Sequence, residues 1–335
     1  MNLGREVYTV RQGFKEVRKR ILASGIAVLL LASLTACGSQ QATSDTGSAA
    51  SAGSAGQAGG KQNWPKELNY GLIPAEVAGN LGDVERKFAE DMGKALGIKV
   101  NVYVGDDYTS VIEAMRAKKV DLGYFGPFSY IIAHQEAGAE PIACKATSKE
   151  NAFYHSEIVV PADSPAKTIA DLKGKTFLYA DPASTSGHLF PQAMISEELN
   201  IPPEKVDSFF SNVSYSGGHD KSIIAIAHHQ ADGAGVCDVC IQRFIDAGMV
   251  KASDFRVIKT SAPIPLDPLT YRNDLPPDLV AKIKEFVLNY DKQNPDYFKK
   301  TGTKAFYPMT DADYKIVYDT AKILHMTPQD ILKKK

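Results

Sequence analysis

Short apolar runs alternate with amphipathic segments from about residue 66 onward. Runs typical of strands occupy 68–74, 98–104 and 120–125, and apolar residues at helical spacing fill 84–96 and 108–117 between them. This order of strand, helix, strand, helix, strand predicts a parallel α/β sheet. In such sheets ligands lie at the carboxyl ends of the strands, so the loops after these three strands are expected to carry a site.

A second set of elements follows a strand predicted at 157–160, which has the character of a crossover. The last two predicted helices bring the chain back to the first group of elements. The pattern predicts strands at 176–180, 206–213, 233–236 and 255–260, a short helix and turn at 169–175, and helices at 189–199, 219–229, 279–290 and 312–324.

Three consecutive hydroxyl residues, Ser184, Thr185 and Ser186, lie where the strand at 176–180 gives way to the helix at 189–199. The first backbone N–H groups of a helix have no partner within it, and the helix dipole favours negative charge there. The hydroxyls add donors without adding fixed charge, which suits an oxyanion. The alternative is an ordinary helix N-cap, which needs one such residue and not three.

The N-terminal 37 residues have the pattern of an export signal. A basic run at 18–20 leads into an apolar stretch at 21–34, too short for a comfortable membrane span, and Cys37 follows at its end. We expect a lipoprotein signal in which Cys37 is lipidated; the alternative is a plain secretory signal with an incidental cysteine. Residues 38–62, rich in Gly, Ser, Ala, Gln and Thr, predict a flexible tether that spans roughly 25–30 Å as a random coil.

The net charge of the chain indicates that an anion site would depend on local groups. The 335 residues hold 38 Lys and Arg and 39 Asp and Glu, a formal net charge of −1, which gives no indication of nucleic-acid binding. Residues 1–36 contain six of the basic and two of the acidic residues, so 32 basic and 37 acidic residues remain. A mildly acidic folded part would have to bind an anion with local dipoles and donors rather than a general basic field.

The remaining cysteines, Cys144, Cys237 and Cys240, are odd in number, and the last two have Cys-x-x-Cys spacing. Outside the membrane such a pair tends to oxidise, so we expect a local disulfide or two small buried apolar residues. A zinc site would need two further ligands, which the sequence does not place; we therefore expect no metal.

Five segments together carry a resemblance to a known family: 108–115, 120–130, 181–187, 217–219 and 263–268. On these segments the chain resembles the phosphonate and phosphite substrate-binding proteins of ABC importers, in order over roughly residues 66–325. The resemblance implies a two-lobed α/β fold of the type II periplasmic-binding-protein class, with lobe 1 from 63–160 and 262–335 and lobe 2 from 161–261.

The resemblance implies a set of ligand-binding residues. Ser184, Thr185 and Ser186 match the family's ligands for phosphonate oxygens. His219 follows two glycines at a helix start and matches a ligand histidine. Tyr108 matches a tyrosine that donates one hydrogen bond from the other lobe.

Three further positions bear on the substituent of the ligand. Phe125 stands where several relatives have Tyr, and is expected to form an apolar wall or to act through its backbone. Asp267 would accept from a protonated ligand oxygen or an amine. A Glu that holds the ammonium in relatives binding 2-aminoethylphosphonate falls at Val239, which shifts the expectation towards methylphosphonate, another short alkylphosphonate or phosphite. If the loop is shifted by one residue relative to those relatives, Asp238 takes the place of that Glu and could hold the ammonium.

Tyr124, Tyr154 and Tyr271 complete the candidate binding residues as further aromatics of the cleft. Because the pattern holds no nucleophile–base pair and no metal cluster, we expect no enzyme and no cofactor. The expected function is a monomeric, lipid-anchored protein that delivers its oxyanion to an ABC permease. Two alternatives are a sensor subunit on the same fold and an extracytoplasmic enzyme acting on phosphoesters through His219 and Ser184.

Overall fold

The computed structural model describes residues 63–78 and 81–333, which belong to a compact unit that begins at Gly60. The predicted export signal, Cys37 and the tether at 38–62 lie outside the described residues. Within the described part of the chain, no helix is both long and apolar enough to cross a membrane.

Six strands form the first sheet, in the order β13–β4–β12–β3–β1–β2. β1 pairs in parallel with β2 and β3, as the alternation of the sequence predicts, whereas β12 runs antiparallel between β3 and β4. The alternation of apolar runs and amphipathic segments did not predict β4, β12 and β13, the three strands that complete this sheet. The bounds are β1 Glu67–Leu72, β2 Lys99–Val104, β3 Leu122–Tyr124, β4 Ala139–Ala146, β12 Pro268–Arg272 and β13 Ala305–Pro308.

Five strands form the second sheet, in the order β10–β6–β9–β7–β8. β7 is parallel to β8 and β9, and β6 is antiparallel to β9 and β10. Because β6 belongs to this sheet, the chain leaves the first sheet before residue 156; the lobe boundaries given above stay a prediction. The bounds are β6 Ser156–Pro161, β7 Thr176–Tyr179, β8 Asn212–Tyr215, β9 Gly233–Cys237 and β10 Phe255–Thr260.

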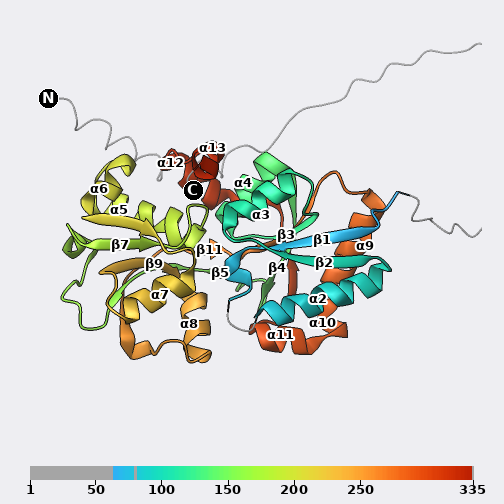
Figure 1. The fold of residues 1–335 in the computed structure, drawn as a ribbon, viewed down its shortest axis with the longest axis horizontal. Coiled ribbons are helices and arrows are strands. Elements are labelled where there is room, and N and C mark those ends of the chain that lie inside the picture. The colour runs from blue at the N-terminus through green and yellow to red at the C-terminus, as the bar shows by residue number, and fades with distance from the viewer. Residues whose placement is uncertain (1–62, 79–80, 334–335) are drawn as a thin grey trace, which may run out of the picture. The chain divides into compact units, whose positions relative to one another are not determined.

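Helices pack on both sheets, and the two sheets lie on opposite sides of Figure 1. We call the six-stranded sheet with α2–α4 and α9–α13 lobe 1, and the five-stranded sheet with α5–α8 lobe 2. The strand predicted at 206–213 is wrong in its first half, where the short helix α6 precedes β8. The helices are α2 Leu81–Leu96, α3 Tyr108–Arg116, α4 Pro127–Ala137, α5 Phe190–Leu199, α6 Val206–Phe209, α7 His219–Ala227, α8 Asp238–Asp246, α9 Pro277–Leu288, α10 Tyr290–Gln293, α11 Pro295–Thr301, α12 Lys315–Ile323 and α13 Pro328–Lys333.

The buried apolar residues form three clusters, and one of them spans both lobes. In lobe 1, Phe88 of α2 lies 5.0–5.9 Å, ring centre to ring centre, from five other aromatic rings. A smaller cluster under α5 contains Phe177 and Ile195. The third joins residues of α3 and α4 to residues of α7 and α8. Contacts at this apolar seam hold the lobes together around the cavity described below.

A two-stranded antiparallel sheet lies where the chain passes between the lobes. It pairs β5 (Phe153–Tyr154) on the outward crossing with β11 (Ile264–Pro265) on the return crossing. The two connections are therefore hydrogen-bonded to each other, and both lead directly to residues that line the cavity.

Candidate binding site

A cavity of about 700 Å³ lies between the lobes. Lobe 1 lines it with the loops after β1 and β3, the start of α3 and the end of β4; lobe 2 lines it with the loop after β7 and the starts of α7 and α8. Two of the three loops expected after the parallel strands of lobe 1 therefore reach it. Of the sequence-predicted residues it brings together Tyr108, Tyr124, Tyr154, Ser184, Thr185, Ser186, His219 and Asp267.

The loop after β7 is fixed by its own short hydrogen bonds. The Asp181 carboxylate accepts from the N–H of Ala183 at 2.8 Å, and the Ser184 hydroxyl accepts from the N–H of Gly187 at 3.0 Å. Ser184 is thus the N-cap of a π-helical turn, Thr185–Leu189, that leads into α5. Thr185 and Ser186 are the first two residues of that turn, so their N–H groups have no partner within the helix.

One residue, Ser184, is enough to cap this helix, so the hydroxyls of Thr185 and Ser186 can make other hydrogen bonds. The Thr185 hydroxyl accepts from the N–H of Phe128, at the start of α4 in lobe 1, at 2.8 Å. That bond does not use the proton of the Thr185 hydroxyl, which lies beside the Tyr154 hydroxyl. The Ser186 carbonyl accepts from the Ser156 hydroxyl at 2.7 Å, which ties the loop to β6. All three hydroxyl residues are buried, at 1–2% exposure.

His219 begins α7 and faces this loop. Its Nε2 lies 3.3 Å from the Ser184 hydroxyl oxygen, and among the described residues its Nδ1 has no hydrogen-bond partner although it is buried. Burial, and then the nearby Arg243 guanidinium, lower the pKa of His219 to about 4. The imidazole is therefore neutral at pH 7, with one N–H donor for an oxyanion.

Two tyrosine hydroxyls approach the same loop. Tyr108 is the first residue of α3, whose N-cap is Asp107, and its N–H donates to Asp181 at 3.3 Å across the lobes. Burial raises the pKa of Tyr108 far above its usual range, so the phenol stays a donor. Tyr154 of β5 is buried as well, and burial followed by the charge of Asp267 raises its pKa in the same way.

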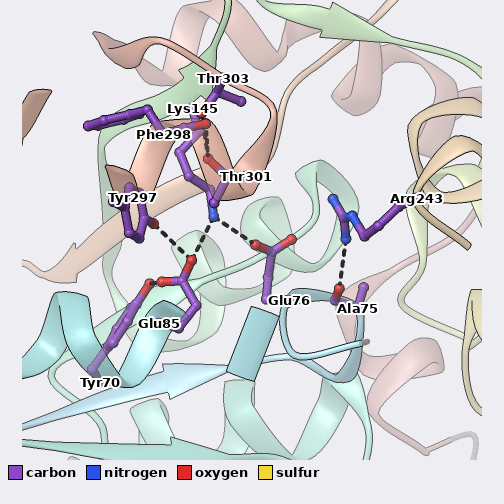
Figure 2. A network of polar contacts seen from close by, with 10 residues as sticks. All are labelled: Tyr70, Ala75, Glu76, Glu85, Lys145, Arg243, Tyr297, Phe298, Thr301 and Thr303. Atoms are coloured by element: carbon purple, nitrogen blue, oxygen red, sulfur yellow. Dashed lines mark hydrogen bonds and ion pairs between the residues drawn. The ribbon is translucent and has the colours of Figure 1, made fainter. Parts of the chain in front are cut away.

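The opposite wall of the cavity contains a buried ion cluster (Figure 2). The Lys145 ammonium lies 2.8 Å from Glu85 and 3.4 Å from Glu76, and its side chain is only 8% exposed. Burial lowers the pKa of Lys145, but the two carboxylates outweigh it and leave the pKa above its usual value. Glu85 also accepts from the hydroxyls of Tyr70 at 2.9 Å and Tyr297 at 2.8 Å.

Asp267 extends this cluster towards the ligand space. Burial raises the pKa of its carboxyl, and so do the charge of Glu76 and the hydrogen bond the two share. A carboxyl with a raised pKa can keep its proton and donate it, which removes the repulsion expected between Asp267 and an oxyanion. Arg243 of α8 donates to the Ala75 carbonyl at 3.3 Å and so reaches across from lobe 2.

Three predicted residues lie elsewhere. Phe125 is fully buried and its ring lies over Gly123, where an added Cβ would come within 2.2 Å of it; it is absent from the cavity lining. The Asp238 carboxylate lies 2.9 Å from Nδ1 of His155. The Tyr271 ring lies 4.8 Å from the Lys284 ammonium of α9, and Tyr271 is absent from the cavity lining. Val239, beside Asp238, does line the cavity.

Sequence reasoning missed Glu76, Lys145 and Arg243. Glu76 is in the loop after β1, which the strand pattern singled out, so that position carried a signal. Lys145 lies on an unpredicted strand, and Arg243 lies in the last turn of α8, where a basic residue is ordinary. Only the fold brings these two into the cavity.

Comparison with known proteins places the chain in a family. Residues 70–314 match the family model for the periplasmic phosphonate substrate-binding proteins of ABC transporters. The phosphonates-binding periplasmic protein of Escherichia coli is 33% identical over 68% of this chain and 67% of its own length. A phosphate-import protein of Mycolicibacterium smegmatis is 29% identical over 76% of this chain and 84% of its own length.

A solved structure agrees with this assignment. The binding component of an ABC phosphonate transporter from Pseudomonas aeruginosa has a TM-score of 0.71 and 25% identity, covering 77% of this chain and 86% of its own. The two mixed sheets are those of the type II periplasmic binding proteins, as predicted. The chain belongs to the phosphonate-binding family of ABC transporters, whose members are extracytoplasmic binding proteins and not enzymes.

Proposed function

We propose that this member of the phosphonate-binding family holds its oxyanion on Ser184, Thr185, Ser186 and His219, and hands it to the permease of its ABC importer. The observation that carries the proposal is the convergence of neutral donors in one cavity: the N–H groups that open the turn Thr185–Leu189, the hydroxyl protons and the imidazole. Preorganised donors of this kind bind an anion without burying an unpaired cation beside it.

The charges of the opposite wall cancel when Arg243, which reaches across from lobe 2, is counted with them. Glu76 and Glu85 balance Lys145 and Arg243 when Asp267 carries a proton, as its raised pKa favours. The cavity then presents no strong field of either sign, and the selection of an oxyanion depends on the donors of lobe 2. This agrees with the mildly acidic composition of the folded part.

Closure of the lobes is the step that traps the ligand. Hydrogen bonds that join the lobes beside the cavity include Tyr108 N–H to Asp181, Phe128 N–H to Thr185, and Arg243 to the Ala75 carbonyl. Two of them involve the loop that would hold the anion, so binding and closure would favour each other. The β5–β11 pair would be the hinge. Export and anchoring through a lipid on Cys37 are part of the same proposal, as is a monomeric state.

Ligand identity is the finer part of the proposal. Val239 gives the cavity an apolar surface where a relative of the amine-binding kind would have Glu, and Asp238 is bonded to His155 instead. We therefore infer methylphosphonate, another short alkylphosphonate or phosphite, ahead of 2-aminoethylphosphonate. The cavity is larger than any of these ligands, so water would fill the rest of it.

Isothermal titration of the full chain tests this directly, with methylphosphonate, phosphite, 2-aminoethylphosphonate and phosphate at one pH. We expect methylphosphonate or phosphite to bind most tightly. Preference for 2-aminoethylphosphonate would contradict the inference from Val239, and preference for phosphate would make this chain functionally similar to its relative from Mycolicibacterium smegmatis. Absence of binding to all four would overturn the proposal.

A further inference from the structure

Three side chains of the kinds that bind thiophilic metals lie together in the lobe 2 wall. His219, Cys237 and Cys240 are 4–5% exposed, and their ligand atoms all lie within 4.8 Å of one another. All three line the cavity. His219 opens α7, Cys237 ends β9 and caps α8, and Cys240 lies in the first turn of α8. In the sequence, the Cys-x-x-Cys spacing indicates only the two cysteines as possible ligands. The fold brings His219 beside them as the third.

The histidine presents an unused nitrogen to this group. Its Nε2 faces the Ser184 hydroxyl at 3.3 Å, while Nδ1 is buried and has no partner among the described residues. Buried polar atoms are nearly always paired, so an unpaired ring nitrogen in a histidine that lies beside two cysteines calls for an explanation. Imidazole nitrogen and cysteine sulfur are the ligands that Zn²⁺ prefers, and Cys-x₂-Cys is a common half of its sites.

In the structure the two cysteines are joined in a disulfide. We propose that reduction of this disulfide converts His219, Cys237 and Cys240 into a binding site for a thiophilic divalent cation, such as Zn²⁺ or Cd²⁺, in the wall of the oxyanion cavity. Two sulfur ligands of a tetrahedral zinc ion lie about 3.8 Å apart when each bond is about 2.3 Å, so the two sulfur atoms have to separate once their bond is broken. The ligand atoms of the three residues already lie within 4.8 Å of one another.

The chemistry balances with a dithiol as reductant. The reductant gives two electrons and two protons, the sulfur–sulfur bond breaks to give two thiols, and the reductant becomes a disulfide. Binding of the cation forms two bonds from sulfur and one from nitrogen and releases the two thiol protons. Two thiolates neutralise the divalent charge, so the occupied site adds no net charge near Arg243.

Three protein ligands leave one position of a tetrahedral ion open. Because all three residues line the cavity, that position faces the ligand space, where a water or an added anion can occupy it. Metal binding itself needs no oxyanion, so a titration without any anionic ligand tests the site separately from the proposed function. If phosphonate binds while the cation does not, only this inference fails.

The test uses the full chain with Cys37→Ser, reduced with a dithiol that is then removed under argon. Cd²⁺ is titrated and followed by the ultraviolet thiolate-to-cadmium charge-transfer absorption, and Zn²⁺ by competition with a chromophoric chelator. We expect one equivalent to bind. Cys237→Ser, Cys240→Ser and His219→Ala should each weaken binding by roughly tenfold or more. Cys144→Ala is the matched control, since that thiol is buried on β4 and outside the group, and it should bind like the parent.

Several results would overturn the proposal. These are equal binding by the unreduced protein, equal binding by Cys237→Ser, loss of binding in Cys144→Ala, or undiminished binding in both His219→Ala and His219→Gln. Circular dichroism checks that each variant is folded. Alkylation mapped by mass spectrometry gives a second measurement on the reduced parent: Zn²⁺ should protect Cys237 and Cys240, and failure to protect them would also reject the site.

Discussion

The two walls of the cavity stabilise buried polar groups in different ways. Around the loop after β7, the lobe 2 wall uses hydroxyls, N–H groups and a neutral imidazole. The loop is held by short local bonds such as the one that the Gly187 N–H donates to the Ser184 hydroxyl. The lobe 1 wall uses full charges, with Lys145 between Glu76 and Glu85. A neutral wall can lose one donor and still be satisfied by water or ligand. A charged wall that loses one partner leaves a buried charge uncompensated.

The largest effect should come from breaking the charged wall. Lys145→Met removes the cation from between two buried carboxylates and should lower the free energy of unfolding by about 3–5 kcal/mol. Urea unfolding measures it. Lys282→Met is the matched control, because Lys282 pairs with Glu285 at 2.7 Å on an exposed helix face, where such a pair contributes about 0–1 kcal/mol. Equal losses in the two variants would show that burial of the Lys145 cluster adds nothing.

Acid should act on the neutral wall through His219. The pKa of its imidazole is about 4 in the folded protein and about 6.5 when unfolded, so the unfolded chain binds the extra proton between these values. The neutral imidazole therefore makes its full contribution to the free energy of unfolding above about pH 6.5. This contribution, on the order of 3 kcal/mol, is lost as pH falls towards 4.

His219→Gln isolates this effect from the carboxyls. Burial raises the pKa of Asp181 to about 6, which works in the opposite direction over the same range. The measurement is the difference in urea stability between parent and variant at pH 7 and pH 5. The variant should become more stable relative to the parent on acidification; a constant difference would mean that the imidazole titrates normally.

Thr185→Ala should have an intermediate effect, on binding. It removes a donor to the anion and the acceptor for Phe128 N–H, and we expect the affinity to fall by about 1–3 kcal/mol. Calorimetric titration gives the number. Thr320→Ala, on α12 outside the cavity, removes a hydroxyl bonded to the Ile316 carbonyl and should bind like the parent. Unchanged affinity in Thr185→Ala would mean that the loop only starts the helix and does not bind the anion.

The smallest effect should come from Asp267→Asn. A protonated Asp267 donates to Glu76, and the amide of Asn can donate in the same place, so the stability should change by less than about 1 kcal/mol. Thermal unfolding at pH 7 measures it, with Asp267→Ala for comparison, which leaves Glu76 without that donor. If Asn destabilises as much as Ala, Asp267 is ionised and the charged wall is more acidic than inferred.

The sequence predicted the lobe 2 lining of the cavity better than the lobe 1 lining, for a physical reason. Ser184, Thr185, Ser186 and His219 lie at strand-to-helix and loop-to-helix junctions, so local rules of helix starts and strand ends single out these positions. Lys145 owes its role to Glu76 and Glu85, 69 and 60 residues away along the chain. No local pattern contains that information.

The fold shows the same division. The parallel strands β1, β2 and β3 follow from alternation and helical spacing, but β4, β12 and β13 pair with partners far along the chain. The error at 206–213 arose because a short apolar run fits a strand and a single helical turn equally well. Phe125 was placed by analogy with a tyrosine; its ring instead covers Gly123.

The β5–β11 pair, as the proposed hinge, would also set how the lobes move. Two separate connections would let the lobes bend, twist and slide with several degrees of freedom. Hydrogen-bonded to each other, they form one narrow ribbon, which bends across its flat face more readily than within its plane. We expect opening to follow a single rotation, so that the same residues meet each time the lobes close. The lobes would then move between the open and closed arrangements along essentially one rotation, and little conformational entropy would be lost on closing.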